Sequence, residues 1–475
     1  ERSGTERSGT GKSGTGKPGT GKPAQPGTFV LSGGTVVDEN AARAADVVVR
    51  GGVIVEIGPR GEVARPAGAT VLDAQGCLVT PGLVDLHTHL REPGGEEAET
   101  IQTGARAAAM GGYTAVVAMP NTEPAMDCAS VVRYVLERAR GACCEVAPSG
   151  SITLGRKGTA LTEMAEMAAL GVRIFTDDGA GVADASLMRR AMEYATGVGA
   201  VIADHCEEPS LAGKGCMNEG AVSSALGLPG RPAVSEEVMV LRDIALARAT
   251  GARLHLLHLS AEASVAAVRL AKAAGVAVTA EVAPHHLVLV DEELRSYQTV
   301  FKVNPPLRTG ADVAALRAAL ADGAIDAVAT DHAPHPPEAK DVAFCDAAPG
   351  MVGLETALAV LLTELVDEKA IDALVHLSGE VAFRGNPEGI VNILGAMSWR
   401  PSRIAGLWPR HGGPLEVGAP ANLCVIDPAR RWRVEPAEFA SRSRNTPFAG
   451  RELVGRVRHT IFNGDPVVVA EEAQR

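Results

Sequence analysis

The sequence predicts an α/β protein, a (β/α)8 barrel of the TIM type with a small β domain built from both chain ends. Strand-like apolar runs alternate with Ala-rich helical stretches from Val84 onward, over about 300 residues, as parallel sheets covered by helices require. Short β-type runs broken by Gly precede this region, and a similar pattern returns from about Pro414. A chain of 475 residues is long enough for a barrel with an appendage.

Composition excludes several classes of protein. The chain has 45 Lys+Arg against 57 Asp+Glu, a formal net charge of -12, which argues against nucleic-acid binding. Hydrophobic residues make up 46% and charged residues 21%, as in an ordinary globular protein. No apolar run reaches the roughly 18–20 residues of a membrane span, and no stretch of signal-peptide type opens the sequence. We therefore expect a cytoplasmic protein without a membrane partner.

The eight cysteines are scattered, and none forms a C-x-x-C pair. In a chain of this length, that distribution is typical of free thiols in a reducing compartment. We therefore expect all eight to be unpaired.

Residues 1–27 are predicted to be a disordered, low-complexity tail. Pentapeptides such as ERSGT and GKSGT follow one another and offer too little apolar surface to offset chain entropy. The Gly-Lys-Ser at 11–13 is not a phosphate-binding loop, because Glu6 stands where that motif needs Gly and no strand precedes it.

Residues 28–82 and 411–475 are predicted to form the two parts of the small β domain. The first contains the runs FVLSGGTVVDEN, ADVVVRGGVIVEIG and ATVLDAQGCLVTPG, which suggest a small antiparallel unit. The second contains PLEVG, ANLCVID and ELVGRVRHTIFNGDPVVV. The two parts can pair with each other beside the barrel.

Residues 83–410 are predicted to form the barrel. TAVVAMP is followed by ASVVRYVLERAR, and VRIFTDD by ASLMRRAMEYATGVG. AVIADHC, RLHLLHLS, VAVTAEVAPHH and DAVATDHAPH are each followed by helix-type sequence. The active site of such a barrel lies at the carboxyl ends of its strands.

Metal-ligand residue types recur at those strand ends. His87 and His89 are two apart on the first strand, so both side chains face the barrel mouth, where imidazoles are natural zinc ligands. Further candidates follow later strands: Asp177, Asp178, His205, His255, His258, Asp331 and His332. Such a set could build a two-metal site that activates water for hydrolysis.

Several motifs resemble those of a known family. HTHLREPGGEEAETIQTGARAAAMGGYTAVVAMPNTEPAMD, at 87–127, closely resembles the motif of class I dihydroorotases of the amidohydrolase superfamily. FTDDGAGVADASLM, ADHCEE, TAEVAPHHLVL, KVNPPLR, ATDHAPH and NTPFAG also match, in order. The resemblance covers roughly residues 28–470.

The resemblance implies a zinc centre. One zinc would be held by His87, His89 and Asp331, a second by His205 and His258, and both would be bridged by Asp178. Asp177 would be a neighbouring structural carboxylate. Hydantoinases and allantoinases resemble this fold but bridge their metals with a carboxylated lysine, whereas this chain has Asp in that region and its nearest upstream lysine is Lys157.

The resemblance also implies the substrate contacts. Arg91 would bind the substrate carboxylate with its forked guanidinium, and Asn121 would assist it. Asn304, His335 and the Pro349-Gly350 backbone would complete the pocket. The family usually has Phe-Gly where this chain has Pro349-Gly350, so the aromatic packing would be lost.

The remaining histidines and Cys206 are assigned lesser roles. His255, His285 and His286 are expected to support the metal ligands. Cys206 is expected to be a buried small residue rather than a nucleophile, and a surface position is expected for His376, His411 and His459.

The function implied is that of a zinc-dependent dihydroorotase. It would interconvert N-carbamoyl-L-aspartate and L-dihydroorotate in pyrimidine (UMP) biosynthesis, with Asp331 as the acid/base group. Two alternatives stay open. One is another cyclic amidohydrolase, such as a dihydropyrimidinase or allantoinase, and the other is a silent structural paralogue in aspartate carbamoyltransferase complexes. A homodimer, possibly associated with aspartate carbamoyltransferase, is the expected assembly.

Overall fold

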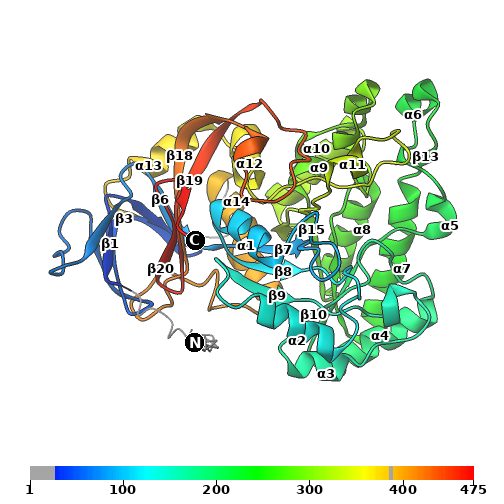
Figure 1. Cartoon of the computed structure of the whole chain (residues 1–475), viewed down its shortest axis with the longest axis horizontal. Coiled ribbons are helices and arrows are strands. Elements are labelled where there is room, and N and C mark those ends of the chain that lie inside the picture. The colour runs from blue at the N-terminus through cyan, green and yellow to red at the C-terminus, as the bar shows by residue number, and fades with distance from the viewer. Residues whose placement is uncertain (1–26, 384–388) are drawn as a thin grey trace, which may run out of the picture.

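A computed structural model describes residues 27–383 and 389–475 (Figure 1). The prediction of a disordered tail at 1–27 therefore lies, except for Gly27, outside the described residues. Within these ranges no helix is both long and apolar enough to cross a membrane.

Strands from both ends of the chain form one sheet. Over the described residues this sheet has 11 strands, and its main path runs β21-β20-β19-β18-β6-β2-β3-β1-β5, with β4 and β17 also paired to β3. The strands are β1 (Phe29–Ser32), β2 (Thr35–Val37), β3 (Ala41–Arg50), β4 (Val53–Pro59), β5 (Thr70–Asp73), β6 (Leu78–Pro81), β17 (Glu380–Ala382), β18 (Leu423–Arg433), β19 (Glu452–Phe462), β20 (Asp465–Val469) and β21 (Glu472–Ala473).

The junction between the two chain ends is the pairing of β6 with β18. Leu423 lies opposite Pro81 and Ile426 opposite Leu78 in an antiparallel register. In Figure 1 the blue strands β1 and β3 and the red-orange strands β18, β19 and β20 accordingly lie on the same side of the molecule. Apolar side chains from both ends, such as Leu31 and Val425, share one buried cluster.

The N-terminal part of this sheet is mixed rather than antiparallel. β1 pairs with β5 and β2 pairs with β6 in parallel, so the antiparallel expectation is wrong for these two pairs. Parallel neighbours need a crossover connection of a dozen or more residues, and the chain between these strands is long enough to supply one.

The alternating region forms parallel strands, as its sequence pattern predicted. The structure describes two parallel sheets here, β7-β8-β9 and β10-β11-β14-β15-β16. Isolated parallel bridges, Gly150 to Phe175 and Thr88 to His332, connect the two sheets at both of their edges. The strands are β7 (Leu83–Thr88), β8 (Tyr113–Ala118), β9 (Glu145–Pro148), β10 (Ile174–Phe175), β11 (Val201–Asp204), β14 (Arg253–Leu256), β15 (Val278–Val282) and β16 (Ala327–Val328).

Helices cover the outside of these strands (Figure 1). Their inner faces are rich in Ala, Val, Leu and Met, and these side chains form the largest buried cluster with the strands. The helices are α1 (Ile101–Met110), α2 (Ala129–Arg138), α3 (Met164–Ala169), α4 (Ala185–Gly197), α5 (Pro209–Ala212), α6 (Ala221–Leu226), α7 (Val234–Thr250), α8 (Glu262–Ala273), α9 (Pro284–Val288), α10 (Gly310–Asp322), α11 (Pro337–Lys340), α12 (Ala357–Leu365), α13 (Glu368–Val375), α14 (Gly389–Met397) and α15 (Trp399–Ile404).

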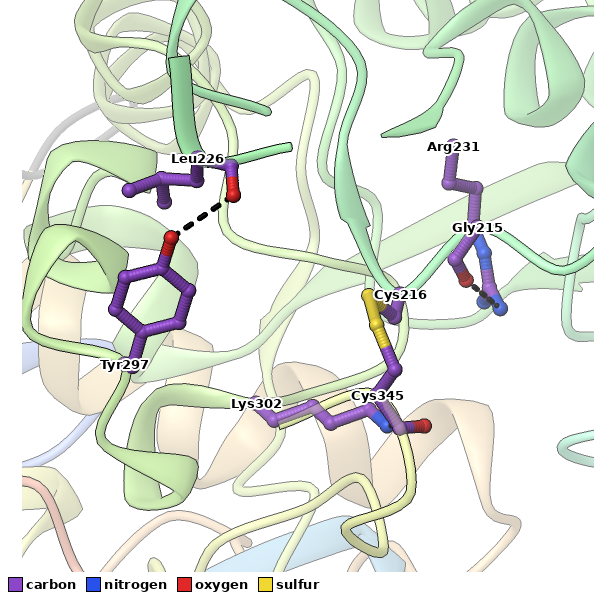
Figure 2. Close-up of a disulfide and its surroundings, with 7 residues drawn as sticks. All are labelled: Gly215, Cys216, Leu226, Arg231, Tyr297, Lys302 and Cys345. Carbon is purple, nitrogen blue, oxygen red and sulfur yellow. Dashed lines mark hydrogen bonds between the residues drawn. A yellow bond between two sulfur atoms is a disulfide. The ribbon is translucent and has the colours of Figure 1, made fainter. Parts of the chain in front are cut away.

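Two cysteines that were expected to be free form a disulfide. Cys216 and Cys345 are 129 residues apart in sequence, but their Cα atoms lie 5.3 Å apart (Figure 2). Cys216 directly precedes the short strand β12 (Met217–Asn218), which pairs with β13 (Gly230–Arg231). The other six cysteines, all within the described ranges, are free, as predicted. The spacing of the cysteines did not show the pair, because only the fold brings these two loops together.

Two histidines predicted on the surface are buried instead. His411 is only 1% exposed and makes hydrogen bonds with Thr114 and Glu145. His459 is 3% exposed and donates to the carbonyl of Asp73. Each has polar partners from distant parts of the chain, and those partners satisfy its ring nitrogens in the interior. His376 is exposed, as predicted.

Candidate metal centre and substrate pocket

Asp178 lies among four histidines at the carboxyl ends of the parallel strands. Its Oδ1 is 3.3 Å from His87 Nε2, 3.6 Å from His258 Nε2 and 3.7 Å from His205 Nδ1. Its Oδ2 is 3.6 Å from His89 Nε2. His87 and His89 come from β7 and its end, while the other residues directly or closely follow β10, β11 and β14. All five side chains are buried.

Asp331, three residues after β16, lies beside the same cluster. Its Oδ1 is 3.2 Å from His89 Nε2 and 3.6 Å from His87 Nε2. Two groups of three ligand atoms, each within 4.8 Å of one another, result: His87, Asp178 and His258, and His87, His89 and Asp331. His205 Nδ1 extends the first group, 2.9 Å from His258 Nε2.

The polar atoms at the centre of this cluster fit bound cations. His87 Nε2 and Asp178 Oδ1 are buried and make no hydrogen bond. Buried polar atoms are normally paired, so unpaired atoms that face one another indicate a ligand. Asp178, Asp331 and Glu281 also bring three carboxylates into the interior around His87, and buried carboxylates need positive charge nearby.

The pKa shifts of His87 and Asp178 also indicate that positive charge is favoured in this cluster. Burial by itself would lower the pKa of His87, but the carboxylates of Asp178, Glu281 and Asp331 outweigh it and raise that pKa well above the ordinary value. Burial opposes ionisation of Asp178, yet the nearby imidazoles hold its pKa well below the usual range. The cluster therefore favours ionised carboxylates with cations between them.

Asp177 lies outside this cluster. Its Oδ1 accepts the backbone N–H groups of Ile152 at 2.8 Å and Thr153 at 3.0 Å, and its Oδ2 accepts the hydroxyl of Thr153. These contacts hold the loop after β9 and leave Asp178, not Asp177, facing the histidines.

Glu281 was not singled out from the sequence, yet it contacts three histidines. From β15, its carboxylate accepts hydrogen bonds from His87 Nδ1–H at 2.9 Å, from His255 Nε2–H at 3.0 Å and from the backbone N–H of His258 at 3.3 Å. With Nδ1 donating to Glu281, His87 presents Nε2 to the centre. A charged residue within the mostly apolar strand VTAEV was the signal that could have identified it.

The supporting histidines differ in their contacts. His255 supports the cluster through Glu281, as expected. His286 Nε2 donates to the carbonyl of Pro305 at 3.0 Å, and no hydrogen bond joins His285 or His286 to a ligand residue within the described chain. The supporting role of these two histidines therefore stays a prediction. Cys206 is buried, as predicted.

Three site residues have a strained backbone. Arg91, His258 and Asp331 have φ values of 59°, 29° and 46°, a region that non-glycine residues rarely adopt. Such conformations persist where the surrounding structure imposes them, and they concentrate at functional sites. These three residues border the same cluster, which supports its functional role.

Arg91 and Asn121 lie beside the histidine cluster. Arg91 Nε donates to the carbonyl of Pro334 at 3.2 Å, and its Nη2 lies 3.5 Å from His335 Nε2. Burial lowers the pKa of Arg91 to about 10, which leaves it cationic at neutral pH. Asn121 accepts His89 Nδ1–H at 2.8 Å and donates to Asp178 Oδ2 at 3.3 Å. Asn121 therefore orients two of the cluster residues.

Asn304 and His335 lie on loops around the cluster. Asn304 Nδ2 is 3.2 Å from His205 Nε2, and its Oδ1 accepts a hydrogen bond from Arg231. His335 Nε2 donates to the carbonyl of Pro349 at 2.8 Å. Burial and the nearby Arg91 lower the pKa of His335 to about 3, so it is neutral.

Two contacts of these loops were missed by the sequence analysis. Arg231 pairs with Glu207 at 2.8 Å while it holds Asn304. Asn445, in the NTPFAG motif, donates to the carbonyls of Ala333 and Gly350 and so connects the segments on either side of the pocket. A cavity of about 350 Å³ adjoins this region, and its walls include Arg231, Asn304 and Pro349.

The matching family model and the most similar curated sequences indicate one family. A family model described as dihydro-orotase-like matches residues 76–264. A dihydroorotase from Streptomyces coelicolor is 50% identical over 427 residues, which is 89% of this chain and 95% of that protein. A dihydroorotase from Pelotomaculum thermopropionicum is 49% identical over 442 residues, 92% of this chain and 98% of that protein.

Solved structures share the fold. An L-hydantoinase (dihydropyrimidinase) from Arthrobacter aurescens superposes with a TM-score of 0.81 at 22% identity, covering 94% of this chain and 97% of that one. A D-hydantoinase (dihydropyrimidinase) from a Thermus species has a TM-score of 0.77 at 25% identity, covering 94% and 96%. These likenesses extend over nearly the whole described chain.

Proposed function

Since this chain belongs to the dihydroorotase family, we propose that it interconverts N-carbamoyl-L-aspartate and L-dihydroorotate at a centre of two zinc ions. Members of this family are cyclic amide hydrolases, and this chain is an enzyme of that kind. The proposal rests above all on one observation, the position of the Asp178 carboxylate between His87, His89, His205 and His258.

The donor set suits zinc. Imidazole nitrogens and carboxylate oxygens are its usual ligands in catalytic sites. One ion would be held by His87, His89 and Asp331, the other by His205 and His258, with Asp178 shared between them. The unpaired His87 Nε2 and Asp178 Oδ1 support this assignment.

The same proposal includes a closed eight-stranded barrel at 83–410, with the β domain at 28–82 and 411–475. The bridges at Gly150–Phe175 and Thr88–His332 support closure, because they connect the two parallel sheets at both edges. In a closed barrel the carboxyl ends of all eight strands surround one site. That arrangement would explain how histidines from β7, β11 and β14 reach Asp178.

Zinc, when bound, supplies a Lewis acid for the ring carbonyl and lowers the pKa of a water molecule. The protein's own residues perform the proton transfers. Asp331 accepts the proton of the attacking water and delivers it to the ring nitrogen that leaves, and it acts in the opposite order during ring closure. Burial opposes ionisation of Asp331, but the nearby imidazoles of His89 and His87 outweigh burial and hold its pKa below the usual range, so the carboxylate is ionised.

The substrate is oriented by the groups around the cluster. Arg91 presents a half-buried guanidinium, whose planar geometry matches a carboxylate. His335, neutral and held by the carbonyl of Pro349, and Asn304, held by Arg231, offer polar contacts on the other sides. This pocket suits a small cyclic amide that carries a carboxylate, as dihydroorotate does.

Asp178 distinguishes this proposal from a hydantoinase-like activity. The solved structures that share this fold include hydantoinases. By the family resemblance, proteins of that kind bridge their metals with a carboxylated lysine. Here an aspartate occupies the central position. The complete set of candidate ligands likewise argues against a silent paralogue. A homodimer, an association with aspartate carbamoyltransferase and a cytoplasmic location stay predictions, which co-purification and cell fractionation would test.

The substrate assignment is tested with Arg91→Met. Losing a hydrogen bond to a charged group costs roughly 1.5–3 kcal/mol, and a forked contact makes two. Because about 1.4 kcal/mol corresponds to a factor of ten, kcat/KM for dihydroorotate should fall about a hundredfold or more. Dihydrouracil has the same ring without the carboxylate, so any hydrolysis of it should be nearly unchanged. The exposed Arg140→Met is the matched control and should alter neither activity.

The ratio of the two specificities decides the result. A wild type that prefers dihydrouracil would refute the dihydroorotase assignment. If Arg91→Met lost both activities equally, the carboxylate contact would be wrong, although the family assignment would stand.

A further inference from the structure

The Cys216–Cys345 disulfide joins two loops at the proposed substrate pocket. One is the segment 213–218, which follows α5 and ends with β12, and the other is the segment 341–350 that ends in Pro349-Gly350. Both cysteines line the cavity of about 350 Å³ whose walls also include Asn304 and Pro349. The disulfide therefore lies at the edge of the pocket, not in a distant part of the fold.

Hydrogen bonds connect each half of the disulfide to the short segment 302–304, which contains the substrate-pocket residue Asn304. Beside Cys216, the carbonyl of Gly215 accepts Arg231 Nη2–H at 2.8 Å, and Arg231 also donates to Asn304 (Figure 2 shows the Gly215 contact). On the other side, the carbonyl of Cys345 accepts Lys302 Nζ–H at 2.7 Å. Lys302 and Asn304 lie two residues apart, so both loops connect to the same short segment.

The second loop also holds His335. The carbonyl of Pro349 accepts the Nε2–H of His335 at 2.8 Å, and Gly350 N donates to the carbonyl of Lys302 at 2.8 Å. Pro349 is exposed and lies four residues beyond Cys345. A shift of the loop at Cys345 therefore moves a partner of His335.

The disulfide is the direct connection between these loops. Across residues 27–383 and 389–475, no hydrogen bond or ion pair joins 213–218 to 341–350. Apolar contact remains, because Cys216 and Phe344 belong to the same buried cluster. Without the disulfide the second loop would stay near the pocket but with greater freedom.

We propose that the Cys216–Cys345 disulfide positions the Pro349-Gly350 loop for substrate binding, so that its reduction weakens substrate binding while the metal centre stays intact. This inference rests on the proposed function, since it assigns the loop to the substrate pocket. The metal ligands follow the parallel strands, and among the described residues no hydrogen bond joins them to either loop. Asn304, which contacts His205, lies outside both loops.

The bond is open to thiol–disulfide exchange with a dithiol. Cys345 is exposed, whereas Cys216 is only 8% exposed. A thiolate of the dithiol attacks Sγ of Cys345 and forms a mixed disulfide, and Cys216 leaves as a thiolate that takes up a proton. The second thiol of the reagent then displaces Cys345, which also ends as a thiol. The dithiol becomes a cyclic disulfide, so two electrons and two protons pass to the protein.

The test compares oxidised and reduced full-length enzyme with zinc bound. A water-soluble phosphine serves as the reductant in place of the dithiol: it attacks one sulfur, water converts the resulting thiophosphonium to phosphine oxide, and both cysteines end as thiols. Free thiols are counted, the Cys216–Cys345 peptide is identified by mass, zinc content is measured, and KM and kcat for dihydroorotate are determined in each state. On reduction KM should rise about three- to tenfold, as expected when a loop must be ordered on binding, while kcat and zinc content stay within about twofold.

Cys345→Ser supplies the matched variant. It should show the raised KM without treatment and should not respond to the phosphine. Cys128→Ser, which removes a free cysteine, should behave like the wild type. Reoxidation of the reduced wild type by a small-molecule disulfide should restore the low KM.

Several results would overturn the inference. These are the absence of the Cys216–Cys345 peptide from the oxidised enzyme, an unchanged KM on reduction, or a loss of zinc or kcat that accounts for the whole effect. Failure of the proposed function is distinguishable, because the enzyme would then turn over no dihydroorotate in either state.

Discussion

Replacing Glu281 by Gln tests how the protein supports its metal centre. The carboxylate of Glu281 is fully buried and accepts hydrogen bonds from His87 at 2.9 Å and His255 at 3.0 Å. Burial raises the pKa of this group, but its histidine partners outweigh burial and hold that pKa at about 2, so it is ionised. Gln preserves the shape but removes the charge and turns one acceptor into a donor. One of the two imidazoles therefore loses its partner.

The magnitude follows from the role of His87. Loss of the group that orients a metal-binding histidine typically weakens metal binding by about 10- to 100-fold. This corresponds to roughly 1.4–2.8 kcal/mol. We expect the binding affinity for the zinc ion held by His87 to fall by that factor. Activity should fall at limiting zinc and recover largely at saturating zinc, because Asp331 and Arg91 are untouched.

The assay is a zinc titration against a chromophoric chelator, combined with metal stoichiometry and turnover at several zinc concentrations. A cobalt-substituted preparation adds a visible spectrum that reports the geometry around His87. Glu166→Gln, at an exposed glutamate on α3, is the control and should bind zinc like the wild type. Unchanged zinc affinity and an unchanged cobalt spectrum in Glu281→Gln would refute the orienting role.

Two further predictions concern Asp331 and Lys340. Asp331→Asn should lower turnover in both directions by about 10²- to 10⁴-fold, whereas Asp177→Asn should mainly lower the melting temperature, because it holds the loop at Thr153. Equal loss of turnover in both variants would contradict the assignment. Burial and the nearby Lys302 lower the pKa of Lys340 in the folded protein from 10.5 to about 7. Between these two pH values the unfolded chain binds more protons than the folded one, so the free energy of unfolding should rise as the pH increases from about 7 to 10.5. In chemical denaturation, Lys340→Met should remove part of that rise. A pH profile identical to that of the wild type would exclude a contribution from Lys340.

The sequence by itself determined the features that depend on local pattern. Alternating apolar strands and Ala-rich helices predicted parallel α/β structure, because side-chain periodicity reflects which face is buried. Ligand-type residues at strand ends, such as His87, Asp178 and Asp331, indicated a common site, since parallel strands end at one edge. The structure brings these side chains together at 3.2–3.6 Å. Their assignment to particular zinc ions came from the resemblance and awaits experiment.

Only the tertiary structure decided which distant groups meet. Glu281 lies within the mostly apolar strand β15, and its contacts with His87 and His255 depend on the order and register of three strands. Cys216 and Cys345 looked like scattered thiols until two loops from different parts of the chain were placed side by side. His411 is buried because Glu145, 266 residues away, satisfies its ring. Long-range pairing of this kind leaves no local period in a single sequence, because each partner can be almost anywhere along the chain.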